Sequence, residues 1–206
     1  GPEGVRSNRA QFGVALSRGL LNEADYLLNA WKPDGEDFSS ALANAGDGAP
    51  YESEVKGLNA VYDAIFHLET DTKDRKLALP MGFRDCEGDD CADEVEGWAS
   101  GQSIRWIEAN VKGFWSLYTG GDGAGMDDLL QDLGHGDLAA DFEVAYVNAI
   151  QVLSSMTGRL DDIIRDSPED SAAIYAALKE LTDLIKGDLA TVLTLEIPQE
   201  AAGDND

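Results

Sequence analysis

Asp63, His67 and Asp71 are spaced by four residues in the segment DAIFHLETD. In an α-helix this spacing places a carboxylate, an imidazole and a second carboxylate on one face. Oxygen and nitrogen ligands of this kind are compatible with iron, zinc or another divalent metal. The same residues also fit an exposed polar stripe on an amphipathic helix, and both interpretations stay open.

The two cysteines of the chain, Cys86 and Cys91, lie close together in the hydrophilic stretch DCEGDDCADE. We expect a disulfide that closes this small loop, as is typical of an oxidising compartment. A metal site would need two more soft ligands, whereas the neighbouring acidic residues are hard oxygens whose spacing matches no standard calcium loop. Free thiols are the remaining alternative.

A glycine-rich stretch, GGDGAGMDD at residues 120–128, invites comparison with phosphate-binding and calcium-binding loops. A P-loop needs a lysine and a Ser or Thr after its last glycine, and this stretch has neither. The dinucleotide fingerprint fails because Met126 stands where the third glycine belongs, and the acidic spacing of an EF-hand is absent. The stretch therefore predicts a turn between two helices, the first of which ends in a left-handed conformation after Thr119.

Catalytic motifs are missing from the chain. There is no H-E-x-x-H, and the two histidines, His67 and His135, are far apart in sequence. Ser100 and Ser103 are not part of the nucleophile elbow G-x-S-x-G. The sequence thus favours a protein that binds rather than one that catalyses.

Composition limits the partners. The chain has 206 residues, a formal net charge of -25 and 43% hydrophobic residues. So strong a negative charge repels phosphate backbones, which argues against nucleic acid. No apolar run approaches the roughly 18 residues of a membrane-spanning helix, so we expect no transmembrane segment.

Hydrophobic periodicity predicts helices almost everywhere. In the last long segment Ile174, Leu178, Leu181, Ile185, Leu189 and Val192 follow helical steps. That helix is expected to begin with Ser167 as its cap and Pro168 in its first turn. Similar stripes predict helices over residues 7–32, 52–77, 102–118 and 137–157, with a short one at 126–133.

These helices predict an all-α fold, an up-and-down bundle of four to five long helices. We expect one domain over residues 1–198 and a flexible acidic tail over 199–206. Two long connections interrupt the pattern, at residues 34–52 and 79–103. The first is expected to contain a short helical turn, and loops of this length are usually functional or cross-linked.

Several segments, in order, resemble the imelysin family, bacterial envelope proteins also classed as M75 peptidases. WASGQS at residues 98–103 resembles the family's Trp-x-Ser-Gly-x-Ser element, and EANVKGFWSLYTGG at 108–121 resembles its "ANLEGFRALFTGG". GMDDLLQDLG and DLAADF then follow at 125–134 and 137–142. TDTKDRKLALPMG at 70–82 is similar to "RDQKLAKALG", and ALKELTDLIKGDLATVLTLEIP at 177–198 is similar to the final helix of the family.

The resemblance implies one bundle of a two-bundle fold, and it corresponds to the C-terminal half. The family's proposed metal motif G-x-H-x-x-E belongs to the other half. The nearest string here begins at Gly57 and has Asn59 for the histidine and Tyr62 for the glutamate. Neither replacement is a good iron or zinc ligand, so the motif is not transferred; both residues remain candidates for ligand contacts.

The resemblance also implies a role. We expect a non-enzymatic protein of the bacterial periplasm or outer envelope, which a lipid anchor would attach to the membrane, that serves iron or haem acquisition. Trp98, Ser100 and Ser103 are the candidates for a ligand cleft shared with a missing N-terminal bundle or another envelope protein. The alternatives are an M75-type metallopeptidase with its catalytic ligands outside this chain, and an interaction module that has lost its metal site.

Overall fold

The computed structural model of the chain describes residues 2–88 and 90–198, and every regular element in these ranges is helical. The all-α prediction is therefore confirmed. The predicted tail at 199–206 lies outside the described residues. Contacts divide the chain into two compact units, Gly1–Leu58 and Asn59–Asp206, where the sequence analysis expected one domain over residues 1–198. Each unit is described by itself.

The first unit contains one long helix, α1 (Pro2–Trp31), and a short one, α2 (Phe38–Ala43). Three aromatic rings join them. Trp31 packs edge-on against Phe38 with ring centroids 4.9 Å apart, and Phe38 contacts Tyr51 in the same way at 6.2 Å. The short helix confirms the helical turn expected within residues 34–52.

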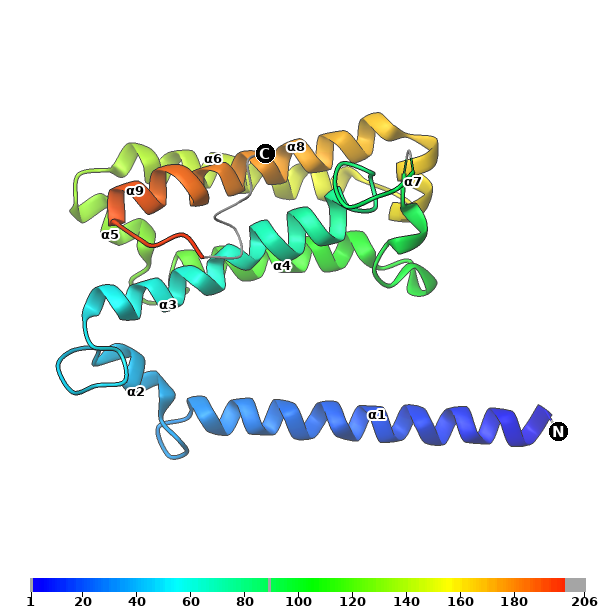
Figure 1. Cartoon of the computed structure of the whole chain (residues 1–206), viewed down its shortest axis with the longest axis horizontal. Helices are drawn as coiled ribbons and strands as arrows, with labels where there is room; N and C mark the ends of the chain where they lie inside the picture. Colours follow the sequence, from blue (N-terminus) through cyan, green and yellow to red (C-terminus); the bar gives the residue numbers. More distant parts are fainter. Residues whose placement is uncertain (1, 89, 199–206) are drawn as a thin grey trace. The chain divides into compact units, whose positions relative to one another are not determined.

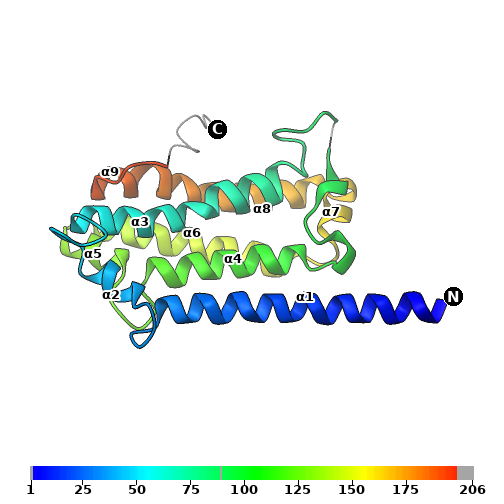
Figure 2. The same ribbon diagram turned by 60° about the horizontal axis from the view of Figure 1, so that its bottom comes forward.

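The second unit is a bundle of helices (Figures 1 and 2). Its first helix is α3 (Glu54–His67), which continues as the π-helix η1 (Leu68–Ala78); α4 (Ser103–Tyr118), α6 (Gly136–Ser155) and α8 (Pro168–Leu184) follow. Consecutive helices run in opposite directions, as Figure 1 shows. The contacts α4 with α6, α6 with α8, and η1 with both α4 and α8 close the ring. The four long helices of the prediction thus pack as an up-and-down bundle.

The last helix of the bundle supplies the centre of its core. α8 continues through a π-helical turn, η4 (Ile185–Leu189), into α9 (Ala190–Leu193). Of the six residues in the predicted stripe, five are completely buried and Val192 is partly exposed. Ser167 takes the N-cap position before Pro168, but its side chain makes no capping hydrogen bond. The stripe was therefore predicted correctly, and the hydroxyl cap was not.

The π-helix η1 was not expected from the sequence. An α-helix was predicted to continue to about residue 77, yet from Leu68 the helix widens so that buried positions recur at Leu68 and Glu69, then at 72–74, then at Leu77 and Ala78. π-helical segments are rare and are frequently found at functional sites. Here the wider turn directs three charged side chains, Glu69 among them, into the protein interior.

The glycine-rich stretch is a turn, as predicted. It joins α4 to α5 (Met126–Asp132), and Gly120 and Gly121 have φ angles of 67° and 63°. A Cβ atom on Gly120 would also lie 2.4 Å from the carbonyl oxygen of Ala124, so only glycine fits there. The backbone N–H of Gly125 donates to the Asp128 carboxylate at 3.0 Å at the start of α5.

Two further short helices cover the bundle. α5 packs on α6, and α7 (Leu160–Asp166) packs on α8 and on the 3₁₀ turn η2 (Ala92–Glu94). The sequence analysis missed α7, which lies between two predicted helices. A second 3₁₀ turn, η3 (Trp98–Ser100), follows in the long connection before α4.

Candidate functional site

A groove of about 800 Å³ runs along the bundle between the α3–η1 helix and α4. This volume lies within the range typical of small-molecule sites. The groove has an apolar floor, a polar rim, and one acidic end contributed by the connection before α4. Its lining residues are Ala64, Ile65, His67, Leu68, Asp71, Thr72, Arg75, Lys76, Leu79, Glu94, Glu96, Ala109, Asn110, Gly113, Phe114 and Leu117.

His67 and Asp71 form a hydrogen-bonded couple at the rim. Nδ1 of His67 lies 2.5 Å from a carboxylate oxygen of Asp71, and the two side chains are 71% and 42% exposed. A carboxylate on one ring nitrogen fixes the orientation of the imidazole and makes its other nitrogen a better ligand. The pair therefore presents Nε2 of His67 as a coordinating atom at the edge of the groove.

The opposite wall of the groove is low because α4 carries small residues there. Ala109 and Gly113 are four residues apart and exposed, and a Cβ atom on Gly113 would have no atom within 4 Å. Asn110, between them, donates from its side-chain amide to the hydroxyl of Thr72 at 3.0 Å. This hydrogen bond joins α4 to η1 at the bottom of the groove. The spacing of these two helices therefore sets the width of the groove.

Two cations lie along the η1 side of the groove. The guanidinium of Arg75 is 3.8 Å from Asp71 and its side chain is 79% exposed. Lys76 is less exposed and pairs with Glu96 at 3.2 Å. Because an exposed guanidinium binds carboxylates readily, Arg75 can contact an acidic ligand, while Lys76 is already engaged.

Behind the groove lies a buried charge network that the sequence analysis missed. Lys73, 1% exposed, lies 2.9 Å from Asp74 and 3.3 Å from Glu69. Lys186 approaches the same oxygen of Glu69 at 3.2 Å, and Arg84 lies 2.5 Å from Asp74. The Lys73 ammonium also sits 5.5 Å from the ring centre of Tyr175, a cation–π distance.

This network connects three parts of the chain. Its carboxylates are on η1, one lysine is on η4, and the arginine belongs to the connection after η1. Burying a charge without a partner costs several kcal/mol, so the charged groups fix η1 against its neighbours. The one signal in the sequence was the concentration of charge in TDTKDRK.

The predicted metal triad is not assembled in the structure. Among the described residues, no group of three or more His, Cys, Asp and Glu side chains is placed to hold a metal ion. His67 and Asp71 stay together, but Asp63 is not one of the residues that line the groove. The imidazole of His67 turns toward Asp71 and η1, and Asp63 lies on the preceding α-helical turn. A metal held by these three residues stays a prediction.

The arrangement can hold a ligand that brings its own chelating atoms. One imidazole nitrogen supplies a single metal ligand, and the apolar floor formed by Leu68 and Phe114 can cover a flat hydrophobic molecule. Arg75 offers a cation for a carboxylate.

A family model described as imelysin matches residues 3–186 of the chain. The chain belongs to the imelysin family. Comparison with curated proteins and with solved structures gives no significant match. The match confirms the resemblance seen in the motifs and includes α1; the assignment to the C-terminal half stays a prediction.

The family-like segments lie around the groove. TDTKDRKLALPMG contains η1 and the buried charges, and the segment from Glu108 to Gly121 covers most of α4 and its turn. The two walls of the groove therefore both contain segments whose sequence resembles the imelysin family. Within these segments, the roles of Asn110 and Gly113 could not be seen without the packing of the helices.

The predicted cleft residues Trp98, Ser100 and Ser103 form a turn before α4. The hydroxyl of Ser100 donates to the carbonyl oxygen of Gly97 at 2.8 Å, and that of Ser103 donates to the carbonyl oxygen of Glu96 at 2.6 Å. Both serines thus hold the local backbone. Trp98 is 58% exposed and does not line the groove; its ligand role stays a prediction.

Asn59 and Tyr62, the other two candidates for ligand contacts, are buried. The amide oxygen of Asn59 accepts a hydrogen bond from the backbone N–H of Glu196 at 2.8 Å, and the Tyr62 hydroxyl donates to the carbonyl oxygen of Ile185 at 2.9 Å. Tyr62 is completely buried and Asn59 is 8% exposed. In this structure Tyr62 connects α3 to η4 and Asn59 connects α3 to the segment after α9, and neither lines the groove.

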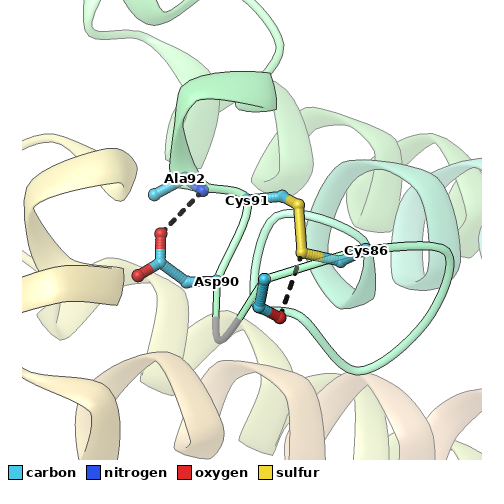
Figure 3. Close-up of a disulfide and its surroundings, with 5 residues drawn as sticks. Cys86, Asp90, Cys91 and Ala92 are labelled. Atoms are coloured by element: carbon cyan, nitrogen blue, oxygen red, sulfur yellow. Dashed lines mark hydrogen bonds between the residues drawn. A yellow bond between two sulfur atoms is a disulfide. The ribbon is translucent and has the colours of Figure 1, made fainter.

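The predicted disulfide is confirmed. Cys86 and Cys91 are joined, with their Cα atoms 6.0 Å apart, and Figure 3 shows the bond within its loop. The backbone N–H of Ala92 donates to the Asp90 carboxylate at 3.1 Å just after it. The backbone N–H of Cys91 donates to the carbonyl oxygen of Pro80 at 3.0 Å, so the closed loop is attached to the segment that follows η1.

Among the described helices of this imelysin, none is both long enough and apolar enough to cross a bilayer.

Proposed function

We propose that this imelysin is an extracytoplasmic binding protein for haem acquisition, and that haem binds in the groove between η1 and α4. The observation that carries the proposal is the His67–Asp71 couple at the rim of an apolar groove. Haem iron takes four nitrogens from its macrocycle and commonly one histidine from a protein. A site that offers one oriented imidazole matches this need.

The rest of the groove fits the other parts of haem. The small side chains of Ala109 and Gly113 leave a flat wall for the macrocycle, and the rings of Phe114 and the side chain of Leu117 give it apolar contacts. Arg75, on the rim one turn beyond Asp71, is placed to pair with a propionate. Membership of the family favours an extracytoplasmic location, and we propose the periplasm or outer envelope.

Bare iron is the closest competing ligand within this role. An iron ion without a chelator requires several protein ligands, usually with carboxylates among them. Asp63 would have to move toward His67 and Asp71 to provide a third. Haem requires no such movement, which is why it is the ligand proposed here. A partner bundle that shares the groove, from an N-terminal half or another envelope protein, stays a prediction.

Absorption titration of the purified chain with ferric and ferrous haem tests the proposal. We expect saturable binding with a shifted Soret band, and we expect His67→Ala to weaken it at least tenfold because the axial ligand is lost. His135→Ala is the matched control, since His135 is exposed at the start of α6 and should bind haem as the wild type does.

Three other outcomes would contradict the proposal. If His67→Ala and His135→Ala weakened haem binding equally, haem would not use the groove. The same conclusion would follow if neither variant weakened it. Tight binding of ferrous iron or zinc that depends on Asp63 would favour the three-residue metal site. Cleavage of a protein substrate that is stopped by a chelator would favour the M75-type metallopeptidase.

A further inference from the structure

The long helix α1 exposes a continuous apolar face. Each described side chain from Glu3 to Asn29 is exposed, including Phe12 at 65%, Leu16 at 54% and Leu20 at 73%. These residues are part of the stripe that predicted the helix. An amphipathic helix in water is stabilised mainly by covering its apolar face, so α1 needs a surface to pack against.

Charge sets α1 apart from the rest of the chain. It contains three arginines and three acidic residues and is therefore neutral, whereas the whole chain carries -25. If two copies of the chain met through their acidic helices, like charges would come together, which costs free energy. Contact through the neutral α1 avoids this repulsion.

The pattern of the apolar face is symmetric about Leu16. Arg9 and Glu23 lie seven residues before and after it, and Val5 and Leu27 lie eleven residues before and after it. Steps of seven and of eleven residues each return to within about 20° of the starting direction on an α-helix. All five side chains therefore lie on one narrow line along α1.

The charges on this line fit an antiparallel copy of the same helix. When two α1 helices cross with Leu16 on the two-fold axis, Arg9 of each faces Glu23 of the other, and Val5 faces Leu27. Within one helix Arg9 and Glu23 are about 21 Å apart at 1.5 Å per residue, so they cannot pair there. Facing opposite charges set the register and the orientation of paired helices.

We propose that this chain forms a two-fold symmetric dimer through an antiparallel pair of α1 helices, with Leu16 at the centre and two Arg9–Glu23 pairs around it. Phe12 and Leu20 flank the central line and enlarge the apolar contact. The interface is isologous, as in most homodimers. It involves no residue of the haem groove, so it stands independently of the proposed function.

Sedimentation velocity of the full chain over a range of concentrations tests this proposal. We expect a dimer for the wild type, and we expect Leu16→Glu to raise the dissociation constant at least about a hundredfold because two carboxylates would meet on the axis. Asn22→Glu places the same charge about 120° around α1 from Leu16, away from the proposed contact, and should leave the dimer unchanged. Circular dichroism of each variant checks that the helical content is kept.

A charge exchange tests the register. Arg9→Glu should raise the dissociation constant about tenfold, because each dimer then contains two repulsive pairs instead of two attractive ones. The double variant with Arg9→Glu and Glu23→Arg should recover wild-type affinity. A wild-type chain that stays monomeric at high micromolar concentration would overturn the proposal, and so would a dimer that Leu16→Glu leaves intact. Failure of the double variant to recover affinity would overturn the register.

Discussion

Two buried tyrosines should respond in opposite ways to the loss of their hydroxyl groups. Tyr62 and Tyr118 are both completely buried. The Tyr62 hydroxyl donates to the carbonyl oxygen of Ile185 at 2.9 Å, whereas the Tyr118 hydroxyl has no hydrogen-bond partner among the described residues. Replacing each tyrosine by phenylalanine removes one oxygen and keeps the ring.

The expected magnitudes follow from that difference. Tyr62→Phe should lower the free energy of unfolding by about 1–2 kcal/mol, since a hydrogen bond is lost and a buried carbonyl loses a donor. Tyr118→Phe removes a buried hydroxyl that is not hydrogen-bonded, so the free energy of unfolding should stay the same or rise by about 1 kcal/mol. The two variants should therefore differ by about 2 kcal/mol, or about 4–8 °C in Tm for a chain of this size.

Urea denaturation at neutral pH, followed by circular dichroism, measures both values. The same experiment at alkaline pH adds a second test. Burial raises the pKa of Tyr62 and of Tyr118 well above the ordinary value of 10.0, and the nearby carboxylates of Asp63 and Asp127 raise it further. The folded state thus keeps both phenols protonated. The corresponding stability is complete below pH 10, where both states are protonated, and is lost as the pH rises above 10 because the unfolded chain then releases protons.

Each Tyr→Phe variant should therefore lose less stability than the wild type when the pH is raised from 9 to 11. Equal changes in the free energy of unfolding for the two variants at neutral pH would refute the reasoning. A larger decrease in the free energy of unfolding for Tyr118→Phe than for Tyr62→Phe would refute it as well. It would mean that the Tyr118 hydroxyl makes the more stabilising hydrogen bond.

Three more predictions concern the charge network, the groove and the disulfide. Lys73→Met should lower the free energy of unfolding by about 3–5 kcal/mol in urea denaturation, since it leaves buried carboxylates without their shared cation. The control Lys112→Met removes an exposed lysine and should have the stability of the wild type. Equal effects of the two substitutions would contradict the burial of the network. Gly113→Ala should raise the free energy of unfolding by about 1 kcal/mol through helix propensity and should still bind haem. Gly113→Leu should fold but fail to bind haem in absorption titration. Haem binding by Gly113→Leu would exclude the α4 wall as a contact. Replacing Cys86 and Cys91 by serine should lower the free energy of unfolding by about 2 kcal/mol, the value expected for a loop of this length. The denaturation midpoint of this variant should no longer respond to a reductant. A variant with the same midpoint as the wild type would mean that the loop is held by its other contacts.

Helical periodicity accounts for most of the fold. The stripe from Ile174 to Leu189 identified the central helix of the core because each of its members faces the same direction and is apolar. The glycine turn after Thr119 was predictable because a positive φ angle and a close backbone approach both select glycine. These features depend on local chemistry, which a sequence shows directly.

Features that depend on tertiary packing were not predictable in the same way. The π-helix η1 was not expected, and neither were the buried charges of Lys73 and Asp74 that it carries. Asn59 and Ser103 were predicted as ligand contacts, which stays a prediction; the partners that the structure gives them are backbone groups. In the case of Asn59, the partner is 137 residues away in sequence. Such partners are set by tertiary packing, which no local pattern contains.

The groove was only half predictable. His67 and Asp71 were identified from their spacing, and the structure brings them together. Asp63 was included by the same rule, but the imidazole can turn toward only one carboxylate. The role of Gly113 in the groove wall could not be predicted, because no sequence pattern distinguishes an exposed glycine that lines a groove from any other glycine in a helix.

The most direct test of the central claim is a crystal structure of the chain with haem bound. The account predicts haem in the groove between η1 and α4, with its iron on Nε2 of His67 and a propionate near Arg75. Haem bound at any other place, or iron coordinated without His67, would contradict it.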